Sequence, residues 1–153
     1  MYERERKIDG IRAAPLVSVI MPAYNAEKYI EEAVSSVLSQ TYKNWELLIL
    51  DDCSSDCTAE IAEYFASLDT RIRLLRNPQN MGVAKTRNRG FDIAKGEWIA
   101  LLDSDDVWHS DKLEKQLVVA GRDGADIIYC SYALVNESGA HLSDYIVPET
   151  TSY

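Results

Sequence analysis

The sequence predicts a three-layer α/β domain, in which helices cover both faces of a mostly parallel, Rossmann-like β-sheet. Short apolar runs typical of buried strands alternate along the chain with longer segments whose apolar residues recur at helical spacing. Two of these runs end directly in acidic residues, as expected where ligands bind at the carboxyl ends of parallel strands. The 153 residues, 46% of them hydrophobic, suffice for one core but not for two ordinary domains.

Nine segments of the chain carry these patterns. The strands are short runs of large apolar or β-branched residues, bounded by Pro, Gly, Asn or Asp. The helices have apolar residues three and four positions apart. The expected elements are strand 16–21, helix 26–40, strand 46–50, helix 58–68, strand 72–75, helix 82–95, strand 98–102, helix 111–119 and strand 127–132.

Particular residues are expected to define the ends and faces of these elements. Asn25 is suited to be the N-cap of the first helix, and Gly96 is suited to close the third helix at its C′ position. Residues 136–139 (NESG) predict a hairpin turn. The apolar stripe of the second helix consists of Ile61, Tyr64, Phe65 and Leu68.

The beginning of the chain differs from the rest. Residues 1–14 mix both signs of charge and carry no strand pattern, so we expect a flexible leader before a single domain at 15–153. No apolar run approaches the ~20 residues of a membrane span, and there is no signal-peptide pattern. We therefore expect a soluble, cytoplasmic protein.

Charge and cysteine usage exclude several classes of function. A net charge of −9 argues against nucleic acid as a partner, because binding to phosphate backbones depends on clustered Lys and Arg. Three cysteines, Cys53, Cys57 and Cys130, form an odd set, which favours reduced thiols over a disulfide framework. Cys53 and Cys57 have no further ligand nearby, since His109 and His141 stand alone, and this disfavours zinc.

Polar side chains follow three of the expected strands at their carboxyl ends. Tyr24 and Asn25 follow the first strand, Asp51 and Asp52 the second, and three aspartates within 103–106 follow the strand at 98–102. Because the carboxyl ends of parallel strands meet at one edge of a sheet, these side chains are expected to lie close together. The sequence therefore predicts a ligand site at this edge.

The aspartates within 103–106 allow two interpretations. Three neighbouring carboxylates repel one another unless a cation neutralises them, and Mg²⁺ or Mn²⁺ would bridge them to a phosphate pair. The alternative is a solvated acidic turn that caps the helix at 111–119. The buried strand that precedes the cluster favours the metal site. Trp108, beside the cluster, is either a rim aromatic or, as we expect, part of the core.

Other charged residues also allow a structural and a functional interpretation. One of Asp51 and Asp52 is expected to cap the following turn, and the other to accept hydrogen bonds from a base or ribose. Lys85 and Arg87 lie on a helix whose N-terminus points to the same edge, where they can reach a diphosphate. Arg89 is expected on a solvated helix face.

At this level of detail the sequence resembles a known family. The resemblance is carried by two segments, VSVIMPAYNAEKYIEEAVSSVLSQTYKNWELLILDDCSSDCT and NMGVAKTRNRGFDIAKGEWIALLDSDDVWHSDKL. Together they closely resemble the N-terminal half of family 2 glycosyltransferases, from about residue 15 to residue 132. The resemblance implies a fold of the GT-A type that binds a nucleotide-sugar donor.

For the nucleotide, the resemblance implies roles for four residues. Tyr24 would pack beside the base, and Asp52 would bind it. Pro22 and Ala23 would line the same pocket. Uracil is the base expected for such a family, so the donor would be a UDP-sugar.

For the diphosphate, the resemblance identifies Asp103-Ser104-Asp105 as the DXD element of the family. Asp103 would lie near the ribose, and Asp105, together with Asp103, would hold a Mg²⁺ or Mn²⁺ ion on the diphosphate. Either Lys85 or Arg87 would approach the phosphates.

The sequence departs from the family pattern in two respects. Many relatives carry glycine where this chain has Cys53 and Cys57, which affects the loop after Asp52. Relatives also carry their general base in a C-terminal half that has no counterpart here, so the catalytic base is unassigned. Among the late carboxylates, Asp144 and Glu149 belong to no motif that marks a base.

The resemblance implies inverting transfer of a sugar from the donor to a hydroxyl acceptor, a glycan or lipid-linked sugar, in cell-surface polysaccharide synthesis. The full-length protein would then work at the inner face of the membrane. This chain alone would bind donor without turnover, and its uncovered apolar edge predicts a homo-oligomer. The alternative is a non-catalytic nucleotide-binding or interaction module. A phosphoacceptor domain is excluded, because its acidic pair would follow the first strand.

Overall fold

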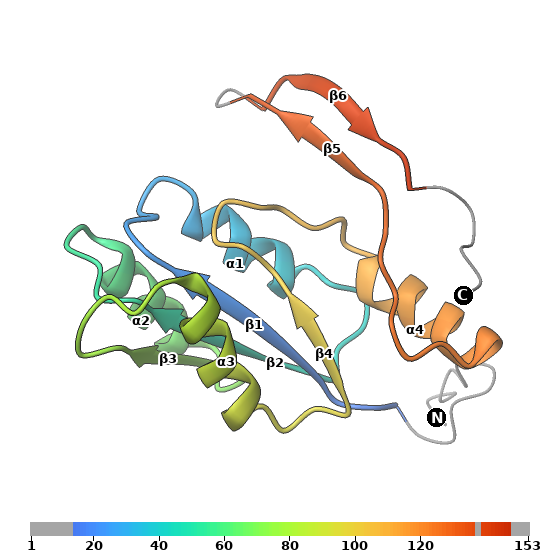
Figure 1. Cartoon of the computed structure of the whole chain (residues 1–153), viewed down its shortest axis with the longest axis horizontal. Helices are drawn as coiled ribbons and strands as arrows, with labels where there is room; N and C mark the ends of the chain where they lie inside the picture. Colours follow the sequence, from blue (N-terminus) through green and yellow to red (C-terminus); the bar gives the residue numbers. More distant parts are fainter. Residues whose placement is uncertain (1–13, 137–138, 148–153) are drawn as a thin grey trace, which may run out of the picture.

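The structure, a computed structural model, describes residues 14–136 and 139–147. The leader expected at 1–14 lies outside the described residues, apart from its last residue. Figure 1 shows the arrangement of the elements. They are β1 (Val17–Ala23), α1 (Ile30–Leu38), β2 (Trp45–Asp51), α2 (Thr58–Leu68), β3 (Ile72–Arg76), α3 (Val83–Ile93), β4 (Trp98–Leu101), α4 (Lys112–Asp123), β5 (Tyr132–Val135) and β6 (His141–Tyr145).

Four strands form one parallel sheet in the order β3-β2-β1-β4. The central strand β1 pairs with β2 from Val17 opposite Trp45 to Ala23 opposite Asp51. All seven residues of β1 and all seven of β2 are buried, as expected for parallel strands that are covered on both faces. The predicted parallel α/β architecture is confirmed.

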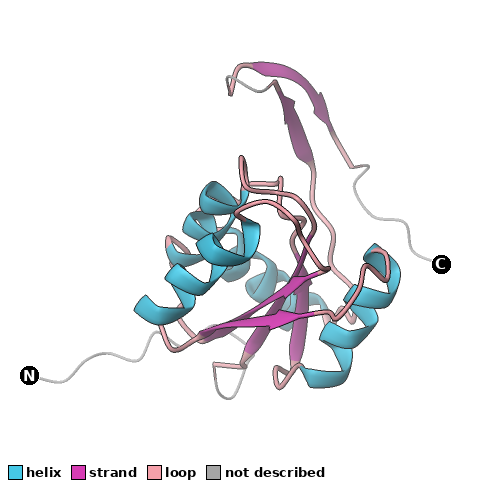
Figure 2. Cartoon of the chain, turned by 90° about the vertical axis from the view of Figure 1, so that its left-hand side faces the viewer, coloured by secondary structure: helices cyan, strands magenta, loops and turns pink. Residues whose placement is uncertain are grey.

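Helices lie on both sides of this sheet (Figure 2). Successive strand residues point to opposite faces, and because β1 and β2 are mostly apolar on both faces, both need to be covered. On one face, Val19, Met21 and Ile49 belong to the main core, which also contains buried residues of α1, α2 and α4. On the other face, Ile20 and Leu50 form a smaller cluster with apolar residues at the end of α3. The structure therefore has the predicted three layers.

Gly96 has a different role from the one predicted. Helix α3 ends at Ile93 and is followed by Ala94 in an extended conformation, so Gly96 is not its C′ residue. A Cβ atom on Gly96 would lie 2.5 Å from the backbone nitrogen of Ser18 and 2.7 Å from the carbonyl oxygen of Leu16. Glycine is required here because the chain passes the start of β1 at close range before it enters β4.

The boundaries of α1 also differ from the prediction. The helix begins at Ile30 instead of residue 26, and its N-cap position is Tyr29, which makes no side-chain capping bond. Asn25 is not the N-cap. It has a φ of 49° and its side chain is hydrogen bonded to the loop after β2, as described below.

Two further expectations about helices need correction. In α2, Ile61 and Phe65 pack against the core, but Tyr64 and Leu68 are 61% and 66% exposed, so the apolar stripe is narrower than predicted. Helix α4 runs past residue 119 to Asp123 and ends with Gly124 in the left-handed conformation. None of helices α1–α4, in the described part of the chain, is long and apolar enough to cross a membrane.

The strand predicted at 127–132 is wrong. Ile127 is 83% exposed, and the first strand after α4 is β5, which pairs only with β6 in a separate antiparallel sheet. An apolar run becomes a buried strand only where helices or another sheet cover it. In the described part of the chain, no helix or sheet covers residues 127–132. The hairpin itself is confirmed, although residues 137–138 of its turn lie outside the described residues.

The backbone at Cys53, directly after Asp52, has a φ of 65°, in the left-handed region that disfavours any side chain with a Cβ atom. We expect Cys53→Gly to raise the free energy of unfolding by about 1 kcal/mol, the strain relieved minus the added entropy of the unfolded chain. Urea denaturation under reducing conditions measures this. Cys53→Ala is the control, since it removes the thiol but keeps Cβ. An equal gain in both variants would assign the effect to the thiol.

Candidate functional site

A cavity of about 390 Å³ lies at the carboxyl edge of the sheet, between the segments after β1, β2 and β4 and the first turns of α3. Nearly all residues predicted for nucleotide and metal binding line it. The exception is Lys85, which is exposed and outside the lining. The lining consists of Pro22, Ala23, Tyr24, Asp52, Asn80, Gly82, Val83, Thr86, Arg87, Asp103, Ser104 and Asp105.

The carboxylate of Asp52 is buried and is held by the segment that leads into α3. Its Oδ1 accepts hydrogen bonds from Asn77 Nδ2 at 2.7 Å and from the backbone N–H of Met81 at 2.9 Å. Its Oδ2 accepts one from the N–H of Gly82 at 2.8 Å. Burial alone would raise the pKa of Asp52, but these bonds outweigh it and hold the pKa below its usual value. Asp52 is therefore ionised, with most acceptor capacity left on Oδ2.

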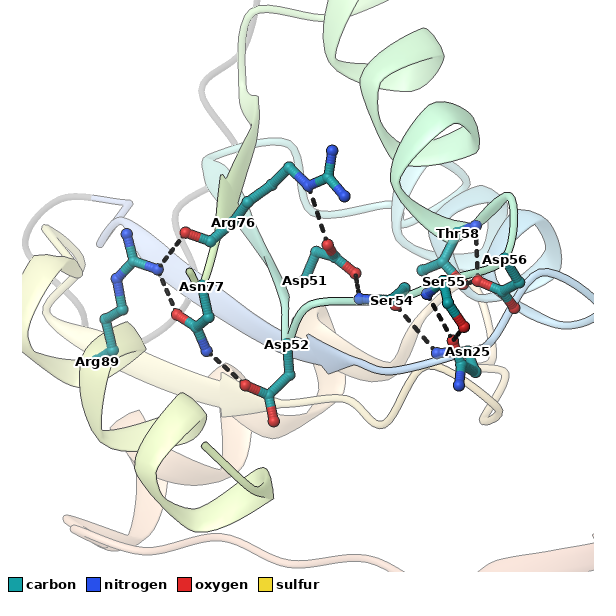
Figure 3. A network of polar contacts seen from close by, with 10 residues as sticks. All are labelled: Asn25, Asp51, Asp52, Ser54, Ser55, Asp56, Thr58, Arg76, Asn77 and Arg89. Carbon is teal, nitrogen blue, oxygen red and sulfur yellow. Dashed lines mark hydrogen bonds and ion pairs between the residues drawn. The ribbon is translucent and has the colours of Figure 1, made fainter. Parts of the chain in front are cut away.

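Behind Asp52, a chain of hydrogen bonds fixes the side chain of Asn77 (Figure 3). Arg89 donates from Nη1 to the Oδ1 of Asn77 and to the carbonyl oxygen of Arg76, the latter at 2.9 Å. Asn77 in turn donates to Asp52 and, at 2.9 Å, to the hydroxyl of Thr86. The solvated position expected for Arg89 is thus wrong, because its guanidinium supports the site from behind.

Asp51 has the structural role that was expected for one member of the acidic pair. Its side chain is fully buried, its Oδ1 accepts from the N–H of Ser54 at 3.2 Å, and its Oδ2 pairs with Arg76 Nε at 3.1 Å. It caps the turn after β2 and points away from the cavity that Asp52 lines (Figure 3).

The loop that carries Tyr24 is joined to the loop after β2 by hydrogen bonds around Asn25 (Figure 3). The N–H of Asn25 donates to Ser54 Oγ at 3.0 Å, and its Oδ1 accepts from the N–H of Ser55 at 2.9 Å. Next to it, the N–H of Ala26 donates to Thr58 Oγ1 at 2.7 Å. The ring of Tyr24 remains 52% exposed at the rim of the cavity, where it can pack against a planar group.

Arg87 and Asp103 form an ion pair at the wall of the cavity. The Nη2 atom of Arg87 binds Oδ1 of Asp103, while its Nε atom is buried without a hydrogen-bond partner among the described residues. A buried donor without an acceptor is unfavourable by roughly 1–3 kcal/mol, and a ligand oxygen would satisfy it. Of the two predicted cations, Arg87 is the one that lines the cavity.

The acidic loop after β4 presents its carboxylates close together. Asp105 is exposed and lines the cavity. The pKa of Asp106 is raised by burial and by the charges of Asp105 and Asp103, which indicates a shortage of positive charge in this loop. Within residues 14–136 and 139–147, no three His, Cys, Asp or Glu side chains converge as a ready metal site. Any cation here would need ligands from a bound molecule or water as well.

Trp108 packs against the main core, as expected, and the ammonium group of Lys112 lies 4.3 Å from the centre of its ring. Burial lowers the pKa of Lys112. The indole therefore fastens the far end of the acidic loop to the core.

Sequence reasoning missed the residues that hold Asp52. Asn77, directly after β3, is 4% exposed and was assigned no role from the sequence. Thr86, between Lys85 and Arg87, was likewise assigned no role, but it is fully buried and lines the cavity. A useful signal was available, since Thr86 lies four residues before Gly90 and seven before Ile93, on the face of α3 that turns toward the sheet.

Comparison with known proteins agrees with this geometry. The family model described as glycosyl transferase family 2 matches residues 18–148 of the chain. The chain belongs to glycosyl transferase family 2.

Curated relatives of this family 2 chain include proteins named for cell-surface polysaccharides. TuaG of Bacillus subtilis, named for teichuronic acid biosynthesis, is 43% identical over 140 residues, which cover 91% of this chain and 56% of TuaG. WfgD of Escherichia coli, named a UDP-Glc:α-D-GlcNAc-diphosphoundecaprenol β-1,3-glucosyltransferase, is 43% identical over 138 residues, which cover 90% of this chain and 53% of WfgD. The chain thus spans about half the length of these relatives.

Solved structures of glycosyltransferases and related proteins also resemble the chain. TarS of S. aureus, crystallised in complex with UDP-GlcNAc, matches with a TM-score of 0.68 and 32% identity over 72% of this chain and 32% of the TarS chain. A mannosyltransferase of Pyrobaculum calidifontis, in complex with GDP-Man and Mn²⁺, matches with a TM-score of 0.68 over 82% of this chain and 37% of that one. At 24% identity, the second match supports the fold alone. The GT-A type of fold expected from the sequence is confirmed.

The depressed pKa of Asp52 predicts a pH-dependent contribution to stability. Ionised Asp52 stabilises the fold above its unfolded-state pKa of about 4, and this stability is lost as the pH falls through the lower folded-state pKa. In Asp52→Asn, the introduced amide group cannot satisfy all three donors. We expect it to lower the free energy of unfolding at pH 7 by about 1–3 kcal/mol. It should also flatten the acid limb, which is the fall of this free energy as the pH drops below about 4.

Urea denaturation between pH 2 and pH 7 measures both effects. Asp92→Asn, at an exposed acid of α3, is the matched control and should leave the acid limb unchanged. An acid limb of equal steepness in Asp52→Asn and the natural chain would contradict the assigned pKa shift.

Proposed function

We propose that this chain is the donor-binding part of a glycosyltransferase that moves a sugar, with inversion, from a nucleoside-diphosphate sugar to a hydroxyl acceptor. The observation that carries the proposal is the single cavity wall shared by Tyr24, Asp52, Arg87 and the acidic loop at 103–105. At one end of this wall, Tyr24 and Asp52 offer an aromatic ring and a carboxylate, which suit a nucleotide base. At the other end, Arg87 and the carboxylates of the acidic loop suit a diphosphate and its metal ion.

At the base end, we assign Asp52 as the acceptor and Tyr24 as the stacking surface. Oδ1 of Asp52 already accepts two protein hydrogen bonds, whereas Oδ2 accepts one from Gly82. A base with an N–H group on its edge can donate to this remaining capacity, as uracil can. Pro22 and Ala23 complete the wall. TarS, which shares 32% identity, was crystallised with UDP-GlcNAc and supports UDP as the donor nucleotide.

At the diphosphate end, we assign Arg87, Asp103 and Asp105. The carboxylate oxygens of Asp105 and Asp103 are hard ligands that suit Mg²⁺ or Mn²⁺. Such an ion, when bound, would stabilise negative charge on the departing diphosphate. We also assign Asp103 to accept from a ribose hydroxyl while it holds Arg87, whose unpaired Nε can donate to a phosphate oxygen.

The acceptor side of the reaction is proposed for the longer protein. Attack by a hydroxyl group requires a base within hydrogen-bond reach, and no carboxylate of this chain is assigned that role. The names of TuaG and WfgD support a polysaccharide or lipid-linked acceptor. The name of WfgD includes diphosphoundecaprenol, a lipid carrier, and we therefore propose that the protein acts at the inner face of a membrane. On this basis the 153-residue chain binds donor without turnover.

Calorimetric titration of this chain with UDP tests the donor site. We expect binding that Mn²⁺ strengthens and a chelator weakens. Asp105→Asn should weaken the Mn²⁺-dependent affinity at least about tenfold, because a lost charge-assisted contact is worth about 1.5–3 kcal/mol. The affinity measured with chelator should stay unchanged in this variant.

The controls separate this site from unspecific effects of charge. Asp126→Asn, at an exposed acid after α4, should bind as the natural chain does. Arg87→Ala should lose affinity with and without metal, whereas Lys85→Ala, on the exposed side of the same helix, should lose little. A chain that binds neither UDP nor another nucleoside diphosphate would contradict the proposal and leave a non-catalytic module.

Self-association of this chain is a separate part of the proposal. Ile99 and Leu101 of the edge strand β4 are 42% and 48% exposed, and the hairpin β5-β6 exposes Leu134 and Leu142 as well. Apolar strand edges of this kind favour pairing with a second copy. Sedimentation velocity over a range of concentrations should show a dimer or larger species, and a monomer throughout would contradict this expectation.

A further inference from the structure

We infer that Gln40 is a positioning residue that holds the acidic loop, and with it the metal and diphosphate end of the site, in place. The acidic loop is defined here as residues 103–110, between β4 and α4. The inference rests on the proposed function for its effect on ligand binding, but its structural part can be tested without any ligand.

The side chain of Gln40 is fully buried and uses both ends of its amide. Nε2 donates to the carbonyl oxygen of His109 at 2.7 Å and to that of Ser36, in α1, at 3.1 Å. Oε1 accepts from the backbone N–H of Leu113 at 3.1 Å. One amide thus joins the end of α1 to the end of the acidic loop and to the first turn of α4.

Helix α4 depends on this contact for its N-terminal cap. The residue at its N-cap position, Asp111, makes no side-chain capping bond. The first N–H groups of a helix have no partner within the helix, and one of them, that of Leu113, is satisfied by Gln40 from 73 residues away in the sequence. The N–H of Leu113 is therefore capped by a residue just after α1 and not by the side chain at the N-cap position of α4.

The acidic loop is consequently fixed at both ends. It follows β4 at Leu102, whose N–H donates to the carbonyl oxygen of Ile20 in β1 at 3.1 Å. It ends at His109 and Ser110, where Gln40 holds the first carbonyl group and the N–H of Thr41 donates to the second at 2.7 Å. The position of the carboxylates between these two ends depends on both anchors.

A neighbouring contact supports the same connection. The hydroxyl of Thr41 donates to Glu114 Oε2, in the first turn of α4, at 2.7 Å, but this pair is exposed to solvent. The bonds of Gln40 to Ser36 and Leu113 are buried and its bond to His109 is partly buried, so water replaces them poorly when the side chain is changed. Gln40 is therefore the residue whose removal should be felt in the loop.

The first experiment measures amide hydrogen exchange in the ligand-free chain. Gln40→Leu keeps the approximate volume but leaves the carbonyl of His109 and the N–H of Leu113 without their partner. We expect exchange at Leu113 and in the first turn of α4 to become at least about tenfold faster, with α2 unchanged. Val34→Ala is the matched control, since Val34 is fully buried in α1, which ends shortly before Gln40, but belongs to the core. Equal exchange in α4 of both variants would overturn the inference.

The second experiment measures UDP affinity with Mn²⁺ and with chelator, at a temperature where both variants are fully folded. Gln40→Leu should lose about tenfold in the Mn²⁺-dependent affinity, while the affinity with chelator, which reflects the base end, should change less than about twofold. Val34→Ala should change neither. A parallel loss of both affinities, or no loss of either, would overturn the positioning role.

The two experiments distinguish the failure of this inference from the failure of the proposed function. If the natural chain binds neither UDP nor another nucleoside diphosphate, or binds it without any effect of Mn²⁺, the proposed donor site is contradicted. The exchange experiment then still decides whether Gln40 holds the acidic loop.

Discussion

Parallel pairing of β1 with both β2 and β4 is the constraint on which the site depends. It places three strand ends at one edge of the sheet, so that the residues after Ala23, Asp51 and Leu101 emerge side by side. The sheet can present polar residues there because its interior is apolar, and every residue of β1 is buried. The segments beyond the strands then need few contacts of their own to converge on one cavity.

Strand periodicity also divides the acidic pair after β2 into two roles. Successive residues of an extended chain point to opposite faces. Asp51 follows Leu47 and Ile49 to the face of α1 and α2, where it is fully buried and paired with Arg76. Asp52 follows the other alternation, toward α3, and lines the cavity. Two adjacent carboxylates thus serve the fold and the site separately, although the sequence alone left open which was which.

The sequence predicted the sheet, the edge at which the site lies and most of its lining, because these follow from periodicity and from residues next to strand ends. It failed where side chains make hydrogen bonds to side-chain or backbone groups that are distant in the sequence. The roles of Asn77, Arg89 and Gln40 depend on partners in other elements, and no local pattern marks them. The error at 127–132 has a different cause, since an apolar run shows the capacity for burial, whereas burial itself depends on covering layers.

Helix α1 connects the two ends of the site. Before its first turn, Asn25 is bonded to Ser54 and Ser55 of the loop after β2, which holds the base end together. After its last turn, Gln40 is bonded to His109 and Leu113, which fixes the acidic loop. The body of the helix is packed into the main core, so it moves little relative to β1. A rigid helix with a contact at each end sets the spacing between the loop after β2 and the acidic loop. Under the proposed function, this spacing separates the base pocket from the diphosphate end of the site.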